Sequence, residues 1–276
     1  MIASTHARRR IAMIGGAALA ATVLLLAPTA PAEAGATAGD ADDHALGSQI
    51  AAHEGGVLER AAPPTPRAGL TRGVDVSAHQ RAVNWAAVAA GGARFAYVKA
   101  TEGTTYHNRY FAQQYNGSYR AGLVRGAYHF ALPDRSDGAA QANFFVDHGG
   151  GWSPDGRTLP PALDMEYNPY GDACYRMSPR DLVGWIRAFS ERVRARTGRY
   201  PVIYTSTRWW ARCTGNDRSL GGAHPLWIPR YGPRIGALPA GWTVHRIWQY
   251  ANSGPLPGDQ NYFNGDQRQL HAFALR

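Results

Sequence analysis

From residue 70 onward, the chain alternates short apolar runs with longer stretches in which apolar residues recur at helical spacing. Short runs rich in Val, Ile, Tyr and Phe are typical of strands, and the longer stretches are typical of helices. The predicted strands are residues 73–77, 95–99, 123–130, 160–168, 200–205, 225–231 and 245–250. The predicted helices are residues 84–90, 107–121, 136–147 and 178–198. This alternation predicts an α/β fold with a parallel sheet, and finding seven strands rather than eight indicates an incomplete or irregular barrel.

Residues 1–34 have the pattern of a secretory signal peptide. Three consecutive arginines precede an apolar run, Ile11–Ala27, and Ala32–Ala34 forms a typical cleavage site, so we expect cleavage before Gly35. The general and the twin-arginine export routes both fit this pattern. The apolar run is about 17 residues long and is followed by Pro28, so no stable membrane span is expected after cleavage. The mature protein is therefore expected to be secreted and extracellular.

The rest of the chain divides at about residue 70. Residues 35–69 are rich in Ala, Gly, Pro and acidic residues, which predicts a flexible N-terminal segment and linker without a packed domain, although part of residues 44–60 could form a short helix. Residues 70–276 are long enough for a single α/β barrel domain.

Charge and cysteine content narrow the class of protein. The formal net charge is +9, and removing residues 1–34 takes away three arginines and Glu33, which leaves +7. There is no run of basic residues and no nucleic-acid motif, so an anionic cell wall is a better partner than nucleic acid.

Cys174 and Cys213 are the only cysteines, and in an exported chain they favour a disulfide over two free thiols. Two thiols alone cannot complete a zinc site, and we expect neither a metal nor a cofactor.

The most informative stretch is 160–168, in which a short apolar run leads to Asp164 and Glu166. Residues two apart on a strand point to the same face, with Cα atoms roughly 6.6 Å apart. Two carboxyls in one environment repel and desolvate each other, which suits one as an acid and the other as a base. A solvated loop with two unrelated acids is the simpler alternative.

Polar residues also lie at or after the ends of the other predicted strands. They are Asp75, Lys99, Glu102, Tyr128, His129, Tyr204, Gln249 and Asp259. The carboxyl ends of parallel barrel strands meet at one mouth, where active sites lie. An acidic mouth ringed by aromatic residues would suit a sugar cleft, because aromatic rings lie against sugar faces and carboxylates bind hydroxyls.

Each of these residues also has an ordinary structural interpretation. Lys99 and Glu102 could form a simple ion pair, and His129 fits a hydrogen-bonded core histidine better than a catalyst. Trp209 and Trp210 could lie either in the core or in the cleft.

Seven blocks in order resemble the glycoside hydrolase family 25 lysozymes of the secreted bacterial type. The blocks are residues 73–80, 95–103, 125–130, 162–171, 202–205, 248–250 and 258–265. The resemblance covers nearly all of the predicted domain. It implies an irregular TIM-like α/β barrel and hydrolysis of the β-1,4 bond between N-acetylmuramic acid and N-acetylglucosamine in peptidoglycan. The departures are small: Ala78-His79 replaces a common His-Trp, Pro229 replaces a small residue, and no wall-binding repeat is present.

The resemblance also implies roles for individual residues. Glu166 would be the general acid and Asp164 its acidic partner, with Asp75 and Asp259 as further carboxylates of the cleft, and Cys174 would pair with Cys213. Because Asp164 lies deeper along the strand than Glu166, we expect Asp164 to stay ionised. The residues expected to bind substrate are Lys99, Glu102, Tyr128, Tyr167, Tyr204, Gln249 and Asn261. We expect a monomer.

Two other functions remain open. A chitinase-like glycosidase would need Asp-x-x-Asp-x-Asp-x-Glu, but Leu159 and Ala162 stand at the first two acidic positions. A carbohydrate-binding protein without turnover would carry a similar aromatic and acidic mouth.

Overall fold

The computed structural model describes residues 43–55 and 69–276. The expected signal peptide and its cleavage site lie outside these ranges, and so do residues 56–68. In the described part of the chain, no helix is long and apolar enough to cross a membrane.

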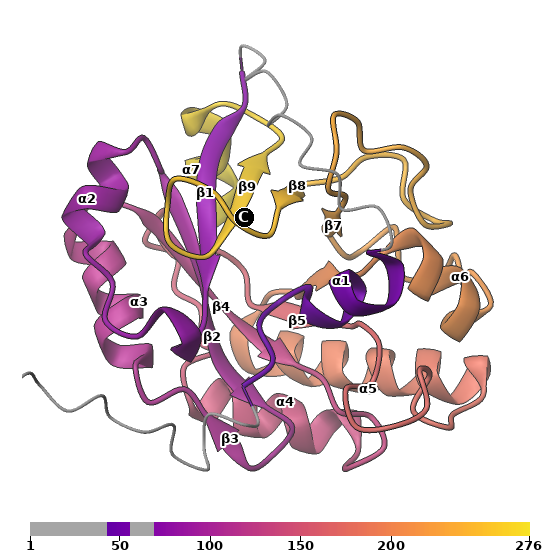
Figure 1. Cartoon of the computed structure of the whole chain (residues 1–276). Helices are drawn as coiled ribbons and strands as arrows, with labels where there is room; N and C mark the ends of the chain where they lie inside the picture. Colours follow the sequence, from indigo (N-terminus) through magenta and orange to yellow (C-terminus); the bar gives the residue numbers. More distant parts are fainter. Residues whose placement is uncertain (1–42, 56–68) are drawn as a thin grey trace, which may run out of the picture. The chain divides into compact units, whose positions relative to one another are not determined.

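Eight strands form a closed barrel (Figure 1). In spatial order they are β1 Thr71–Val76, β2 Phe95–Glu102, β4 Val124–Phe130, β5 Ala162–Asp164, β6 Val202–Tyr204, β7 Leu226–Pro229, β8 Ile247–Ala251 and β9 Asp259–Phe263. Pairing of β1 with both β2 and β9 closes the ring. The short strand β3, Tyr106–His107, forms a hairpin on β2. The α/β barrel expected from the sequence is confirmed.

The sheet is mixed, so the expectation of a purely parallel sheet was wrong. β9, which the apolar pattern did not predict, runs antiparallel to both β1 and β8. Only residues 252–258 connect β8 to β9. A parallel return needs a crossover of about a dozen residues or more, so this short connection imposes the antiparallel direction.

Helices cover the outside of the barrel. They are α2 Trp85–Ala90, α3 Phe111–Arg120, α4 Gly138–Asp147, α5 Pro179–Thr197, α6 Thr207–Thr214 and α7 Gln267–Leu275, with a 3-10 turn at Ala78–Gln80. The longest helix, α5, begins where the sequence predicts, because the Ser178 side chain accepts a hydrogen bond from the Asp181 amide at 3.2 Å. It ends at Gly198, whose φ of 78° suits glycine.

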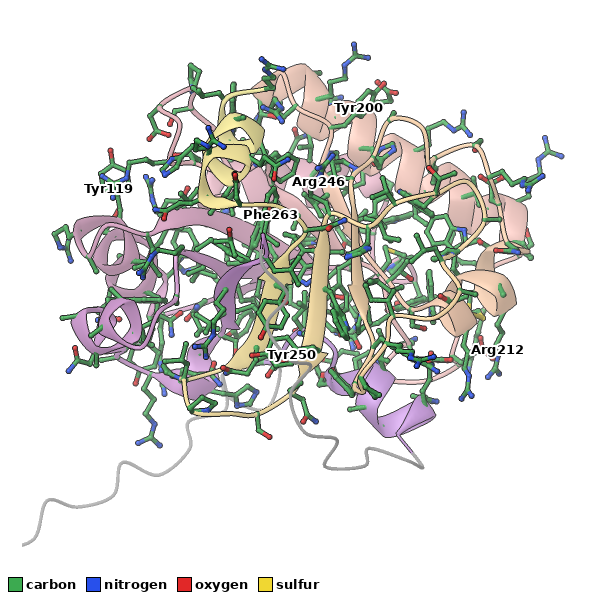
Figure 2. The ribbon with its side chains drawn as sticks, turned by 90° about the horizontal axis from the view of Figure 1, so that it is seen from above. Tyr119, Tyr200, Arg212, Arg246, Tyr250 and Phe263 are labelled. Carbon is green, nitrogen blue, oxygen red and sulfur yellow. A yellow bond between two sulfur atoms is a disulfide. The ribbon has the colours of Figure 1, made fainter. Side chains whose placement is uncertain are left out.

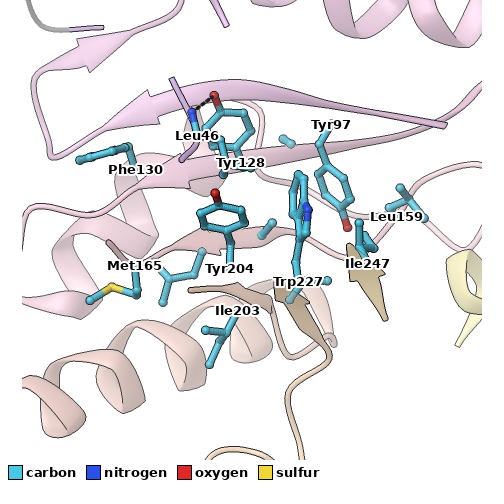
Figure 3. Packing of buried hydrophobic residues seen from close by; sticks show 14 of the residues in the cluster. Leu46, Tyr97, Tyr128, Phe130, Leu159, Met165, Ile203, Tyr204, Trp227 and Ile247 are labelled. Carbon is cyan, nitrogen blue, oxygen red and sulfur yellow. Dashed lines mark hydrogen bonds between the residues drawn. The ribbon is translucent and has the colours of Figure 1, made fainter. Parts of the chain in front are cut away.

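Aromatic side chains fill the barrel interior (Figure 3). The Trp227 ring packs against Tyr97, with centroids 4.7 Å apart, and against the edge of Tyr204 at 5.4 Å. The barrel is therefore a packed core, and a ligand can reach only its end.

A second layer of aromatic packing lies under α6. Trp209 and Trp210 are fully buried, so they belong to the core rather than to a cleft. Cys174 and Cys213 form the expected disulfide, with Cα atoms 5.2 Å apart. This bond ties the loop after β5 to α6, and it stabilises the fold by about 4 kcal/mol in the chain-entropy model.

Residues 43–55 are not the loose linker that the composition of 35–69 indicates. They contain helix α1, Ser48–Glu54, which lies beside β5 at the carboxyl ends of the strands (Figure 1). Leu46 and Ile50 are 1% and 4% exposed, so they are as buried as core residues.

Candidate active site

Asp164 and Glu166 lie together at the carboxyl end of β5. Asp164 is the last residue of the strand, Glu166 lies two residues beyond it, and both are fully buried. The backbone there is held on both sides. The Met165 amide donates to the Tyr204 carbonyl at 2.9 Å, and the Tyr175 hydroxyl donates to the Glu166 carbonyl at 2.9 Å.

Asp75 and Asp259 reach the same mouth from the other side of the ring. They are paired residues of β1 and β9, and the reversed direction of β9 brings its first residue to the carboxyl end of β1. The Gln249 side-chain amide donates to both carboxylates, at 3.1 Å to Asp75 and 3.0 Å to Asp259. Asn261 donates to Asp75 at 2.6 Å. The four acids named from the sequence therefore share one end of the barrel.

All four carboxyls hold protons more tightly than usual. Burial raises the pKa of Glu166 to about 8, against the hydrogen bonds that it accepts, and raises the pKa of Asp75 to about 7. Burial and then the charge of Glu166 raise the pKa of Asp164 well above its ordinary value. Burial and the charge of Asp75 do the same for Asp259.

Of the four carboxyl groups, that of Asp164 has the fewest hydrogen bonds to offset the cost of its burial. Apart from the neighbouring Glu166 carboxyl, its two oxygens meet no hydrogen-bond donor among the described residues. The expectation that Asp164 stays ionised therefore does not fit the closed, buried mouth, because nothing there balances its charge except the more distant Lys99.

Lys99 and Glu102 form an ion pair at 2.6 Å. Residues three apart on a regular strand point to opposite faces, but β2 shifts register between Lys99 and Thr101, and this irregularity brings both side chains to one side. Glu102 is buried, yet the charge of Lys99 lowers its pKa to about 2. Lys99 also pairs with Asp43 at 2.9 Å.

Tyrosine hydroxyls line the mouth. Those of Tyr204 and Tyr231 both donate to the Gln249 carbonyl oxygen at 2.8 Å. Tyr128 lies on β4, which β5 separates from the β6 strand of Tyr204, and its hydroxyl accepts a hydrogen bond from the Leu46 amide at 3.3 Å (Figure 3). Tyr231 was not singled out from the sequence, although its place two residues after β7 is the signal that identified the others.

Two polar residues serve the framework. The Asn261 side chain is fully engaged, since its amide donates to Asp75 and its oxygen accepts from Trp227 at 2.8 Å. His129 is bonded to Thr101 at 2.7 Å and Gln141 at 2.9 Å in the core. Asn261 therefore positions Asp75 rather than presenting an amide to substrate, and His129 is the core histidine that we expected.

The segment 43–55 covers this mouth. The Glu166 carboxylate accepts three backbone N–H bonds from it: from Gly47 at 2.8 Å and from Gln49 and Ile50 at 2.9 Å each. Sequence reasoning missed this contact. The only local signal is the four-residue spacing of Leu46 and Ile50, which fits one face of a short helix.

No group of three or more His, Cys, Asp or Glu among the described residues is placed to hold a metal ion. The sequence model of one protein family, glycosyl hydrolases family 25, matches residues 74–259. This range includes all four acids of the mouth. The chain belongs to glycoside hydrolase family 25. It is therefore a glycoside hydrolase, and the resemblance that the sequence blocks indicated is confirmed.

Individual family 25 proteins match closely. Lysozyme M1 of Streptomyces globisporus is 40% identical over 97% of this chain and 95% of its own length. The muramidase structure from Acremonium alcalophilum is 49% identical, with a TM-score of 0.73, covering 74% of this chain and 99% of that one. The bacterial lysozyme structure from Streptomyces coelicolor is 43% identical, with a TM-score of 0.74, covering 76% and 99%.

Proposed function

We propose that this chain is an exported lysozyme that hydrolyses the β-1,4 bond between N-acetylmuramic acid and N-acetylglucosamine in peptidoglycan, with Glu166 as general acid. The observation that carries the assignment of Glu166 is its place at the barrel mouth, two residues beyond β5 and beside a second buried carboxyl, Asp164, because two neighbouring carboxyls disfavour each other's ionisation. A carboxyl that stays protonated at neutral pH can donate a proton to a leaving oxygen.

Proton donation is the step that the bond requires. A glycosidic oxygen is a poor leaving group unless it is protonated as the bond breaks, so an acid must lie within hydrogen-bond reach of it. Glu166 has the longer side chain and lies beyond the end of β5, nearer the mouth, whereas Asp164 belongs to the strand itself. Glu166 gives its proton to the departing sugar and becomes a carboxylate, which then takes a proton from the water that adds to the anomeric carbon and so returns to its acid form.

Asp164 acts on the other side of the breaking bond. Once the mouth is open to solvent and substrate, its carboxylate stabilises positive charge at the anomeric carbon or orients the acetamido group of the substrate as an internal nucleophile. Asp75 and Asp259 hold the adjoining amides in place through Gln249 and Asn261.

Substrate contacts come from the rim of the mouth. Tyr128, Tyr167 and Tyr204 present rings and hydroxyls suited to sugar faces, with Lys99 and Glu102 as charged hydrogen-bonding partners and Gln249 as an amide. The outer surface carries arginines such as Arg212 on α6, which points away from the barrel (Figure 2). The formal charge of +7 after export favours an anionic wall.

Export is supported by two features. Residues 1–34 have the pattern of a signal peptide, and Cys174 and Cys213 form a disulfide, which is typical of oxidising compartments.

The test is digestion of purified peptidoglycan followed by mass spectrometry of the reduced products. We expect fragments that end in reduced N-acetylmuramic acid. Fragments that end in reduced N-acetylglucosamine would contradict the bond assignment. Turnover of chitin oligosaccharides without turnover of peptidoglycan would support a chitinase-like enzyme, and binding without reducing ends would support a carbohydrate-binding protein.

A further inference from the structure

The groove that holds Glu166 is occupied by the chain's own N-terminal segment, residues 43–55. This segment touches most of the residues that we expect to bind substrate. The Leu46 amide donates to the Tyr128 hydroxyl, and the Leu46 carbonyl accepts from Gln249 at 3.4 Å. The Tyr167 hydroxyl donates to Glu54 at 3.0 Å, and the Tyr167 ring stacks on His53 with centroids 4.3 Å apart.

The charges of the segment match those of the groove. Its acidic ends meet cationic or hydroxyl groups, since Asp43 pairs with Lys99 and Glu54 accepts from Ser206. Its uncharged middle presents three N–H donors to the Glu166 carboxylate. Satisfied donors and buried apolar residues of this kind are typical of a bound ligand rather than of a passing loop.

Gly47 shows how closely the segment fits. Its φ of 79° lies in the left-handed region. A Cβ atom at this position would overlap the Tyr204 hydroxyl and would lie 2.7 Å from that of Tyr231. Only glycine therefore allows the backbone to approach the mouth this closely.

We propose that residues 43–55 are a built-in inhibitor that fills the catalytic groove and keeps the enzyme inactive until the segment leaves. While both Glu166 oxygens accept bonds from the segment, neither can reach a glycosidic oxygen. That the segment occupies the groove follows from the geometry alone. That this contact lowers enzyme activity also rests on the proposed function.

The rest of the chain is suited to work without the segment. The family 25 match begins at residue 74, after the segment has ended. The match to each of the two solved relatives uses 74% to 76% of this chain and covers 99% of the relative. Those proteins therefore form the same domain without a counterpart of the other quarter of this chain. The match to Lysozyme M1 spans 97% of this chain and so reaches across the segment.

Tethering makes even a weak contact effective. A ligand joined to its site through a short flexible linker has an effective concentration on the order of 1 mM. If the free peptide binds with a Kd of about 0.1 mM, the tethered segment lowers activity about tenfold.

The test compares the exported chain with Gly47→Val and Ala52→Ser variants of the same length. Gly47→Val places a branched side chain in the left-handed region and against Tyr204, so it expels the segment without altering the barrel. Ala52→Ser is the matched control, because Ala52 is in the same helix but exposed. Mass spectrometry verifies that the segment is still attached in each protein.

We expect kcat/KM on soluble peptidoglycan fragments to be at least about tenfold higher for Gly47→Val than for the unaltered chain or Ala52→Ser. Gly47→Val should match the chain that begins at residue 70. Equal activity of all four proteins would overturn the inhibitor proposal while leaving the proposed function intact.

A binding measurement separates failure of the proposal from failure of the proposed function. A fluorescent peptide of residues 43–55 should bind the chain 70–276 saturably, and the Gly47→Val peptide should bind at least about tenfold more weakly than the Ala52→Ser peptide. If no protein hydrolyses peptidoglycan but the peptides behave in this way, the substrate is wrong and the groove contact stands. Absence of saturable binding would overturn the contact itself.

Discussion

Two groups of buried ionisable side chains lie at the barrel mouth. They differ in whether a cation lies next to their carboxyl groups. On the β2 side, Lys99 pairs with Glu102 at 2.6 Å and with Asp43 at 2.9 Å. On the β5 side, Asp164 and Glu166 are buried together without a cation between them.

The protonation of the two groups follows from this difference. Glu102 has a pKa lowered to about 2 by Lys99, although it is buried, whereas burial raises that of Glu166 to about 8. Equal burial therefore gives opposite shifts, and the neighbouring cation decides the sign.

We infer that the unbalanced group carries out the chemistry, whereas the balanced group stabilises the mouth and offers charged hydrogen-bonding groups to substrate. A buried carboxyl without a cation lowers stability when it ionises, and such a group is retained where a proton is to be moved. In the paired group, the Glu102 carboxyl is ionised at neutral pH and has no proton to donate. Three predictions test this division, in order of decreasing effect.

The largest effect is expected from Glu166→Gln. The amide keeps the shape of the side chain but cannot donate the proton, so turnover of peptidoglycan should fall by roughly 10²–10⁴ while sugar binding changes little. The measurement is kcat and KM on soluble peptidoglycan fragments. It is made on the chain that begins at residue 70, so that the N-terminal segment does not interfere.

Asp164→Asn is the matched control for Glu166→Gln. A substrate with an activated aryl leaving group needs little protonation, so it should partly rescue Glu166→Gln but not Asp164→Asn. The reverse pattern of rescue would exchange the two roles. Near-normal turnover of peptidoglycan by Glu166→Gln would remove the residue from the mechanism.

The second prediction concerns the balanced group. Lys99→Met leaves Glu102 and Asp43 buried without their cation, which should lower the free energy of unfolding by roughly 3 kcal/mol. Arg268→Met is the control, since Arg268 is an exposed cation 3.5 Å from Asp266, and its loss should change stability by about 0.5 kcal/mol or less. Urea denaturation at pH 7 measures both.

A double variant sharpens this result. Because Glu102→Gln removes the charge that Lys99→Met leaves unbalanced, the two changes together should cost less than the sum of the single changes. A loss below about 1 kcal/mol for Lys99→Met would show that the pair contributes no more than an exposed one.

The two groups also differ in how far the sequence could predict them. The Asp164 and Glu166 pair was predictable, because a short apolar run fixes the strand and the two-residue spacing fixes a shared face. The Lys99 and Glu102 contact was less so, since residues three apart share a face only because β2 shifts register there.

Elements without an apolar signal escaped prediction. β9 begins with Asp259, Gln260 and Asn261, so it lacks the apolar start that marks the other strands, and its antiparallel direction depends on the short connection before it. The seating of residues 43–55 depends on backbone N–H groups. Every residue except proline carries that donor, so no side-chain pattern records the contact.

Per pH unit, the smallest effect is the pH dependence of stability, in which the two groups act at opposite ends of the pH range. The pKa of Glu102 is lowered to about 2, so its contribution is present above about pH 4.5 and is lost as pH falls toward 2. His129 acts in the same direction, because burial lowers its pKa to about 4. The pKa of Glu166 is raised to about 8, so its contribution is present below about pH 4.5 and is lost as pH rises through 8.

The free energy of unfolding should therefore be greatest near pH 4.5 and fall on both sides, by roughly 1 kcal/mol per pH unit for each titrating group. Urea denaturation from pH 3 to 9 measures the profile on the intact chain. Glu166→Gln should lessen the alkaline fall and leave the acid side, while Lys99→Met should lessen the acid fall and leave the alkaline side. If Glu166→Gln left the alkaline fall unchanged, the fall would have to come from the other carboxyls of the mouth, and Asp75→Asn would test the one whose pKa of about 7 acts in the same direction.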